Sequence, residues 1–482
     1  MTKRVLSDAA RRIRPAVFAE FQARVDRLAA EGKELIPLHI GDTHLPPPQA
    51  ARRVLGGFDA DDPVLHRYGA TAGLAPLREA MARVLARREL EVDPASEIVV
   101  GNGGTHALYC AARAVLDAGD EVIVASPYWP LAPGVFIACG AVPVEAPLSQ
   151  QLYEDPSRDP AKLLASALTE RTKAVYFISP NNPDGKVFSA AQLERIAAFA
   201  REHDLWVFSD EVYADIVFSS GEAVTESSRT AATPGGRGEA TSIATLPGMR
   251  ERTITLHSLS KSHALAGLRV GFVTAPEPVV TAARRVSTHT AFNVSVAMQH
   301  AAVAALADDA FPTQARDAYR SARDAAIAAL HGAPIDFHVA EGATYLFVDF
   351  ARALAARDGV RAAGPRAPIR LLPSSFRRFP SDRFVTPPPD TPVSVVVAPR
   401  AARNSVEILG PQTDRCSSAR PLYAILERAV DRGVLLAPGD AFGEAFGKSF
   451  ARLCFTSVPP SRVVSGIERL REALDAYLAD RP

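Results

Sequence analysis

The stretch His-Ser-Leu-Ser-Lys at residues 257–261 follows an apolar run, Thr-Ile-Thr-Leu at 253–256, and shortly precedes Gly-Leu-Arg-Val-Gly-Phe at 267–272. The apolar, β-branched run predicts a buried strand, so Lys261 falls at the C-terminal end of that strand. A lysine in this position can form an imine with an aldehyde, while neighbouring hydroxyl groups and an arginine hold an anion. The motif alone fits a surface lysine equally well, so the rest of the chain decides between the two interpretations.

Length and composition are typical of a globular protein with two or three domains: 482 residues, 47% hydrophobic and 22% charged. Lys plus Arg and Asp plus Glu both total 54, which removes a global electrostatic argument for nucleic acid or an anionic membrane as a partner. No apolar run approaches the roughly 20 residues that span a bilayer. The basic N-terminus lacks the apolar core of a secretory signal, so we expect a cytoplasmic protein.

Metal binding is not expected from the cysteine spacing. The four cysteines form no Cys-x-x-Cys pair and no zinc-like arrangement with histidine, and we interpret them as reduced, largely buried thiols: Cys110, Cys139, Cys416 and Cys454.

Strand-like and helix-like segments alternate through most of the chain. Continuous apolar strands that alternate with helices predict an α/β fold with a mostly parallel sheet covered on both faces. The strand candidates are 97–100, 121–125, 174–178, 205–208, 253–257 and 270–274. We expect a helix from 105 to about 118, another after the capping box at 189–192, and a tail helix from about Ser461.

We divide the chain into three segments by composition and pattern. Residues 1–50 form an N-terminal arm, 51–310 a large domain, and 311–482 a smaller α+β C-terminal domain. The C-terminal domain is interrupted at about 351–420 by an insertion rich in Arg, Pro, Ala and Ser. This insertion fits a lid, an interface element or a solvated loop.

Two further motifs place polar side chains after predicted strands. Ser-Pro-Asn-Asn-Pro-Asp-Gly at 179–185 is a turn that carries Asn182 beyond the strand 174–178. The strand at 205–208 leads to Asp210, with Tyr213 three residues later. Taken separately, these patterns also fit a tight turn and a helix N-cap.

A glycine-rich turn, Gly-Asn-Gly-Gly-Thr-His at 101–106, stands between a strand and a helix. Glycines let the backbone approach a phosphate, and the helix N-terminus offers free N–H groups. Downstream, Tyr128 and Trp129 offer a ring that stacks on a cofactor or simply packs in the core.

Asn182, Asp210 and Lys261 all fall at C-terminal ends of predicted parallel strands, the edge at which open α/β sheets bind ligands. This combination suits pyridoxal phosphate (PLP). Lys261 forms the imine, Asp210 pairs with the protonated pyridine nitrogen, and Asn182 and Tyr213 contact the phenolate oxygen.

The order of these motifs resembles the class I/II aminotransferases, the aspartate aminotransferase superfamily of PLP fold type I, over about 13–350 and 421–480. The resemblance implies a large domain with a seven-stranded, mostly parallel sheet, and a homodimer with shared active sites. It also implies a transferase of amino acid metabolism or biosynthesis that moves an amino group from an L-amino acid to a 2-oxo acid through a Schiff base on Lys261.

Carried over residue by residue, the resemblance assigns Lys261, Asp210 and Tyr213 to catalysis. It implies that the cofactor is bound by a larger set: Gly103, Gly104, Thr105, Tyr128, Trp129, Asn182, Asp210, Tyr213, Ser258, Ser260, Lys261, Arg269 and, from the partner subunit, Tyr68. Trp129 matches the stacking aromatic better than Tyr128 does. For the substrate, Arg452 matches the arginine that grips the α-carboxylate, and the other implied contacts are Gly41, Asn182 and His44.

The sequence departs from the family pattern at several places. Thr43 and His44 replace an acidic and an aromatic residue, His106 follows the phosphate turn, and the segments 219–250 and 351–420 are longer than usual. These departures leave open a PLP-dependent lyase, a replacement or cyclisation enzyme, or an oxidase of specialised metabolism. A regulator that binds PLP without turnover is a third interpretation. His289 and Asn293 are candidate specificity residues, whereas the arginines of the insertion fit a solvated loop.

Overall fold

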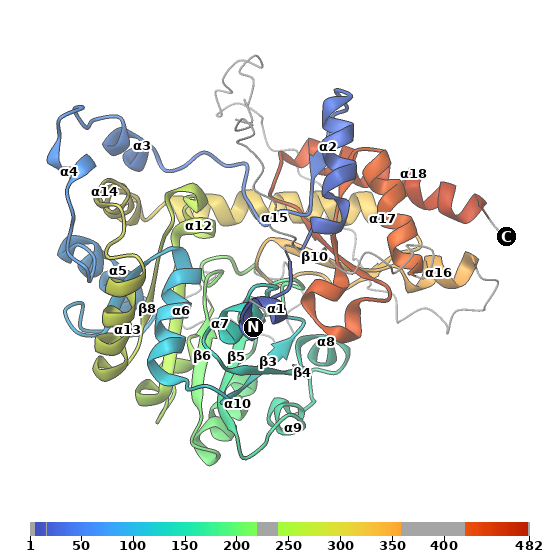
Figure 1. Ribbon diagram of the computed structural model, residues 1–482. Helices are drawn as coiled ribbons and strands as arrows, with labels where there is room; N and C mark the ends of the chain where they lie inside the picture. The colour runs from blue at the N-terminus through green and yellow to red at the C-terminus, as the bar shows by residue number, and fades with distance from the viewer. Residues whose placement is uncertain (1–4, 16, 219–239, 358–419, 481–482) are drawn as a thin grey trace.

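The computed structural model describes residues 5–15, 17–218, 240–357 and 420–480. A seven-stranded sheet, together with the helices on both of its faces, forms the larger part of the molecule (Figure 1). In spatial order its strands are β2 (Ile98–Asn102), β8 (Val270–Thr274), β7 (Thr253–Ser258), β6 (Trp206–Asp210), β5 (Thr172–Ile178), β3 (Glu121–Ser126) and β4 (Val142–Pro147).

Alternate residues of each strand pack on opposite faces of the sheet. In β3, Val122 and Val124 belong to one apolar cluster, which includes residues of α6 (Gly103–Val115) and α7 (Ala132–Ala138). Ile123 and Ala125 belong to a second cluster, with residues of α10 (Ala190–Glu202). Both faces are therefore buried, which explains why the strands are continuous apolar runs.

All six predicted strands are present, and the predicted α/β fold with a mostly parallel sheet is confirmed. β8 is the antiparallel strand, because it pairs antiparallel with both β7 and β2. The sequence reasoning missed β4, which contains Pro143 and Pro147. Proline cannot donate a ladder hydrogen bond, but β4 is an edge strand, where that loss is tolerated.

The other helices up to residue 306 precede, connect or follow the strands of this sheet in the chain. They are α1 (Asp8–Arg12), α2 (Gln22–Ala30), α3 (Gln49–Leu55), α4 (Pro63–His66), α5 (Ala75–Ala86), α8 (Ser149–Glu154), α9 (Pro160–Ala165), α12 (Leu259–Ser262), α13 (Glu277–Thr290) and α14 (Val296–Leu306).

A smaller antiparallel sheet lies against the long helices of the C-terminal part. Its order is β12 (Ala437–Pro438), β13 (Phe450–Cys454), β10 (Tyr345–Asp349) and β9 (Asp336–Phe337). The helices are α15 (Phe311–Leu330), α16 (Ala351–Arg357), α17 (Pro421–Asp431) and α18 (Pro460–Ala479). The short β1 (Ile36–Pro37) pairs with β11 (Val434–Leu435), so residues before 50 join this C-terminal part.

The predicted division of the chain into three segments stays a prediction. The predicted insertion at 351–420 begins as α16, and its residues 358–419 lie outside the described residues, as do residues 219–239 of the long loop. Among the helices that the structure describes, none combines the length and apolarity needed to cross a membrane.

The capping box predicted at 189–192 is present at the start of α10. The Ser189 hydroxyl accepts a hydrogen bond from the Gln192 N–H at 3.2 Å, and the Gln192 side chain accepts one from the Ser189 N–H at 3.1 Å. We expect Ser189→Ala to lower the free energy of unfolding by about 1 kcal/mol, because one N–H of the first turn loses its acceptor. Urea unfolding measures the change.

The matched control is Ser321→Ala, on the exposed face of α15. Its effect on the unfolding free energy should stay within about 0.5 kcal/mol. Equal midpoints for the wild type and Ser189→Ala would contradict the assigned role of the cap.

Candidate active site

Three adjacent parallel strands, β5, β6 and β7, bring the predicted polar residues to one edge of the large sheet. A cavity of about 420 Å³ opens there, and Asn182, Asp210, Tyr213 and Lys261 all line it. The size lies within the range of small-molecule sites. The sequence prediction that these side chains converge at the sheet edge therefore agrees with the geometry.

Asp210 is a carboxylate that the fold buries at the end of β6, with 3% of its surface exposed. The Tyr176 hydroxyl donates a hydrogen bond to Oδ2 at 2.8 Å, and the Val212 N–H donates to Oδ1 at 3.2 Å. Burial raises the pKa of Asp210 to about 7, despite these two hydrogen bonds. A cation in contact with this carboxylate would favour its charged form.

Lys261 lies in α12, the short helix that follows β7. Its Nζ donates a hydrogen bond to the Gly41 carbonyl, and its own backbone carbonyl accepts one from the Tyr319 hydroxyl at 3.1 Å. The Ser258 side chain caps the helix by accepting from the Ser260 N–H at 3.2 Å. The amine therefore enters the cavity from a backbone that is fixed at both ends of the helical turn.

Hydroxyl groups, a helix N-terminus and a guanidinium gather on one side of the cavity. Gly104 and Thr105 line it from the first turn of α6, and Ser258, Ser260 and Arg269 line it from the β7–β8 connection. Gly103 has φ +77° and packs against the Arg269 guanidinium, so a side chain at 103 would collide with it. Free N–H groups and a positive charge at this place suit a phosphate.

Arg452, on β13, also lines the cavity. Its Nη1 donates to Asn182 Oδ1 at 3.0 Å and its Nη2 donates to the His39 carbonyl at 2.6 Å. The guanidinium carbon lies 4.5 Å from the ring centre of Tyr345. The side chain is buried, and its Nε has no hydrogen-bond partner in the structure. A desolvated guanidinium with a free N–H is well suited to a carboxylate.

Three residues that the sequence reasoning missed also shape this cavity. Tyr345 shares a hydrogen bond of 2.6 Å with the Tyr213 hydroxyl, and its own hydroxyl leaves no room for a side chain at Gly41. Tyr176 holds Asp210, as described above. His39 lines the cavity, and burial together with the Arg452 charge lowers the pKa of His39 to about 4.

Four predicted cofactor or substrate contacts do not line this cavity in the single chain, and neither do the candidate specificity residues His289 and Asn293. Tyr128 lies on a neighbouring cavity and its N–H donates to the Phe442 carbonyl at 2.9 Å, whereas Trp129 lines the Lys261 cavity. Gly103 lies behind the lining, the His44 ring is 3.0 Å from the Thr456 carbonyl, and Tyr68 is 84% exposed.

The residues present fit PLP. A buried carboxylate without a cationic hydrogen-bond donor suits the pyridinium nitrogen, Lys261 suits the aldehyde, and the anion-binding side suits the phosphate. Within the part of the chain that the structure describes, no group of three or more His, Cys, Asp or Glu side chains could hold a metal ion.

Comparison with known proteins agrees with the geometry. The family profile "Aminotransferase class I and II" matches residues 33–378. The aspartate aminotransferase of Streptomyces avermitilis is 34% identical over 60% of this chain and 65% of its own length. The aspartate/prephenate aminotransferase of Thermus thermophilus is 33% identical over 79% of this chain and 92% of its own length.

Solved structures show the same architecture. Thermus thermophilus aspartate aminotransferase with maleate has a TM-score of 0.73 at 26% identity and covers 98% of this chain and 100% of its own. The aromatic aminotransferase of Pyrococcus horikoshii has a TM-score of 0.69 at 26% identity, with 94% and 99% covered. The chain belongs to the class I and II aminotransferases, enzymes of the aspartate aminotransferase type that use pyridoxal phosphate as their cofactor.

Proposed function

We propose that this protein moves the amino group of an L-amino acid to a 2-oxo acid, with PLP held on Lys261. The observation that carries the proposal is that one cavity is bordered by the Lys261 amine, the buried Asp210 carboxylate and the buried Arg452 guanidinium. These groups provide a base, a partner for a ring cation and a clamp for an α-carboxylate.

The bound cofactor supplies an aldehyde and a conjugated ring that accepts electrons from the α-carbon of the donor. Asp210 holds a proton on the ring nitrogen. Tyr213 and Asn182 orient the ring through its phenolate oxygen. Lys261 Nζ takes the proton from the donor's α-carbon, and Arg452 fixes the α-carboxylate so that this proton faces the amine.

We also propose a cytoplasmic homodimer with shared active sites. Tyr68 is 84% exposed and packs on Phe292, whose side chain is 42% exposed, with 4.6 Å between ring centres. Exposed aromatic rings of this kind suit a subunit contact, in which Tyr68 would reach the partner's phosphate site. Three cysteines that the structure describes are buried free thiols, which suits a reducing compartment.

The half-reaction tests the proposal. We expect a single L-amino acid, added to the PLP-loaded protein without any 2-oxo acid, to give pyridoxamine phosphate and one equivalent of the matching 2-oxo acid. The visible spectrum and mass spectrometry follow the two products. Lys261→Ala should abolish the conversion, because the base is lost, while the exposed Lys162→Ala control should retain it. Release of ammonia or of a side-chain fragment would point to elimination or oxidation instead.

The role of Arg452 separates substrate binding from cofactor binding. We expect Arg452→Ala to raise KM for the amino acid by about 30- to 1,000-fold, as a buried charged hydrogen bond is worth about 2–4 kcal/mol. The dissociation constant for PLP should change by no more than about threefold. Arg462→Ala, on the exposed face of α18, serves as control. Equal loss of both affinities would show that Arg452 acts structurally, through Asn182 and His39.

The Asp210 carboxylate predicts a pH dependence of stability in the cofactor-free protein. Its pKa rises from an ordinary value of 3.8 to about 7 on folding. Between these values the folded protein holds a proton that the unfolded chain has released, so this group's contribution to stability falls as pH rises. We expect Asp210→Asn to remove that fall. In thermal unfolding, the melting temperature of the variant should gain on that of the wild type as pH rises from 5 to 8.

Asp317→Asn, at an exposed position on α15, is the matched control and should follow the wild-type pH curve. Parallel curves for the wild type and Asp210→Asn would refute the raised pKa. With saturating PLP, melting temperature should change with pH by the same slope in the wild type and in Asp210→Asn. The reason is that a ring cation then favours the charged carboxylate.

A further inference from the structure

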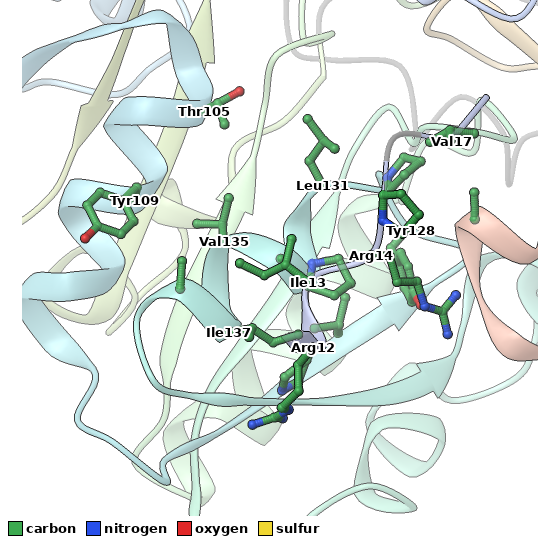
Figure 2. A pocket seen from close by; sticks show the side chains of 18 of the residues that line it. Arg12, Ile13, Arg14, Val17, Thr105, Tyr109, Tyr128, Leu131, Val135 and Ile137 are labelled. Atoms are coloured by element: carbon green, nitrogen blue, oxygen red, sulfur yellow. The ribbon is translucent and has the colours of Figure 1, made fainter. Parts of the chain in front are cut away.

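A second, larger cavity adjoins the Lys261 cavity. We call it the side chamber; its volume is about 1130 Å³. The N-terminal segment with Arg12, Ile13 and Arg14 borders it (Figure 2), and residues of α7, β3 and β4 also line it. The volume slightly exceeds the usual range of small-molecule sites, so the chamber has room for a large organic group.

The two cavities share part of their lining. Val17, Thr105, Pro130 and Leu131 border both of them. Thr105 also lies in the first turn of α6, beside the proposed phosphate site. The two cavities therefore adjoin each other at these four residues.

The charged groups of the Lys261 cavity are already assigned. They are Asp210, Lys261, Arg269 and Arg452, which the cofactor and the α-carboxylate require. His39 adds no positive charge, because its pKa lies near 4. Among the described residues of this chain that line the cavity, no cation is left for a second carboxylate.

The side chamber itself is electrically balanced. Arg12 and Arg14 carry two positive charges, and Glu145 and Glu444 carry two negative ones. Arg14 Nη1 already donates to the Asp440 carbonyl at 2.9 Å, and Glu145 accepts from the Glu444 N–H at 2.9 Å. A neutral ligand is the best match for such a surface.

The rest of the chamber wall is mainly apolar. Burial raises the pKa of Tyr128 to about 12, so this ring stays neutral. Figure 2 shows its ring together with aliphatic side chains of α7 and of the N-terminal segment around the space. The main apolar contributors are Ile13, Tyr109, Val124, Val135, Ile137 and Val144.

We propose that the side chamber receives the side chain of the amino donor, and that the preferred donors are α-amino acids with a long, neutral and mainly apolar side chain. This inference rests on the proposed function. The α-carboxylate stays on Arg452, and the side chain passes Val17 and Leu131 into the chamber. Apolar area that leaves water on binding then adds affinity with each added methylene group.

Binding of unreactive carboxylates to the PLP-loaded protein tests this directly. Phenylacetate, 4-phenylbutanoate and 6-phenylhexanoate present the same carboxylate with increasing apolar reach, and calorimetry gives their dissociation constants. We expect affinity to rise about two- to fourfold for each methylene group. Affinity that is independent of chain length would overturn the proposal.

The variant Gly134→Phe provides a second test, because it should narrow the chamber at a position where an added side chain causes no backbone collision. The glycine lies on α7, and the nearest atom to an added Cβ is Ile13 Cγ2 at 3.5 Å, an ordinary contact. We expect the affinity ratio of the long to the short carboxylate to fall toward one. Gly56→Phe, where an added Cβ would similarly lie 3.5 Å from Arg52 O, is the matched control and should leave the ratio unchanged. If Gly134→Phe leaves the affinity ratio unchanged, or changes only the oligomeric state, the chamber does not bind the side chain and the proposal is wrong.

The amino-acid half-reaction separates this inference from the proposed function. We expect 2-amino-6-phenylhexanoate to react with a higher kcat/KM than aspartate or alanine. Conversion of aspartate or alanine with no gain for the long donor would overturn the side-chamber proposal alone. No conversion of any of the three, with PLP bound, would overturn the proposed function, and the carboxylate series would then judge the chamber independently.

Discussion

Burial of the Asp210 carboxylate at the end of β6 is the constraint on which the site depends. A hydroxyl and a backbone N–H support it, but neither carries a positive charge. Its pKa near 7 reflects that deficit. A protein that keeps such a group at a ligand-binding sheet edge sacrifices stability in the empty state, and a bound pyridinium restores it. The cavity thus suits a ligand that places a cation against this carboxylate.

The second requirement is that both sheets meet at this edge. Asn182 comes from the turn after β5 and Arg452 from β13, and their hydrogen bond of 3.0 Å joins the large sheet to the small one. The same guanidinium binds the His39 carbonyl, which ties in the N-terminal segment. A movement of the small sheet would therefore change the cavity around Arg452 while the strands that carry Asp210 and Lys261 stay in place.

The convergence of polar side chains at the strand ends could be predicted from sequence because it is encoded locally. Asn182, Asp210 and Lys261 each lie within five residues of the end of an apolar run, so the parallel order of β5, β6 and β7 brings them together. Tyr176 was missed because a tyrosine within a strand has the pattern of a core residue, and Tyr345 because its contacts with Gly41 and Tyr213 join distant segments. The side chamber was missed for the same reason, since its walls come from several separate segments.

The most direct test of the account is to reduce the PLP-loaded protein with borohydride and map the modified peptide by mass spectrometry. We expect one cofactor per chain, attached at Lys261, with the three other lysines between residues 51 and 310 unmodified: Lys162, Lys173 and Lys186. Attachment at another lysine, or no attachment after saturation with PLP, would contradict the assignment of this cavity as the cofactor site.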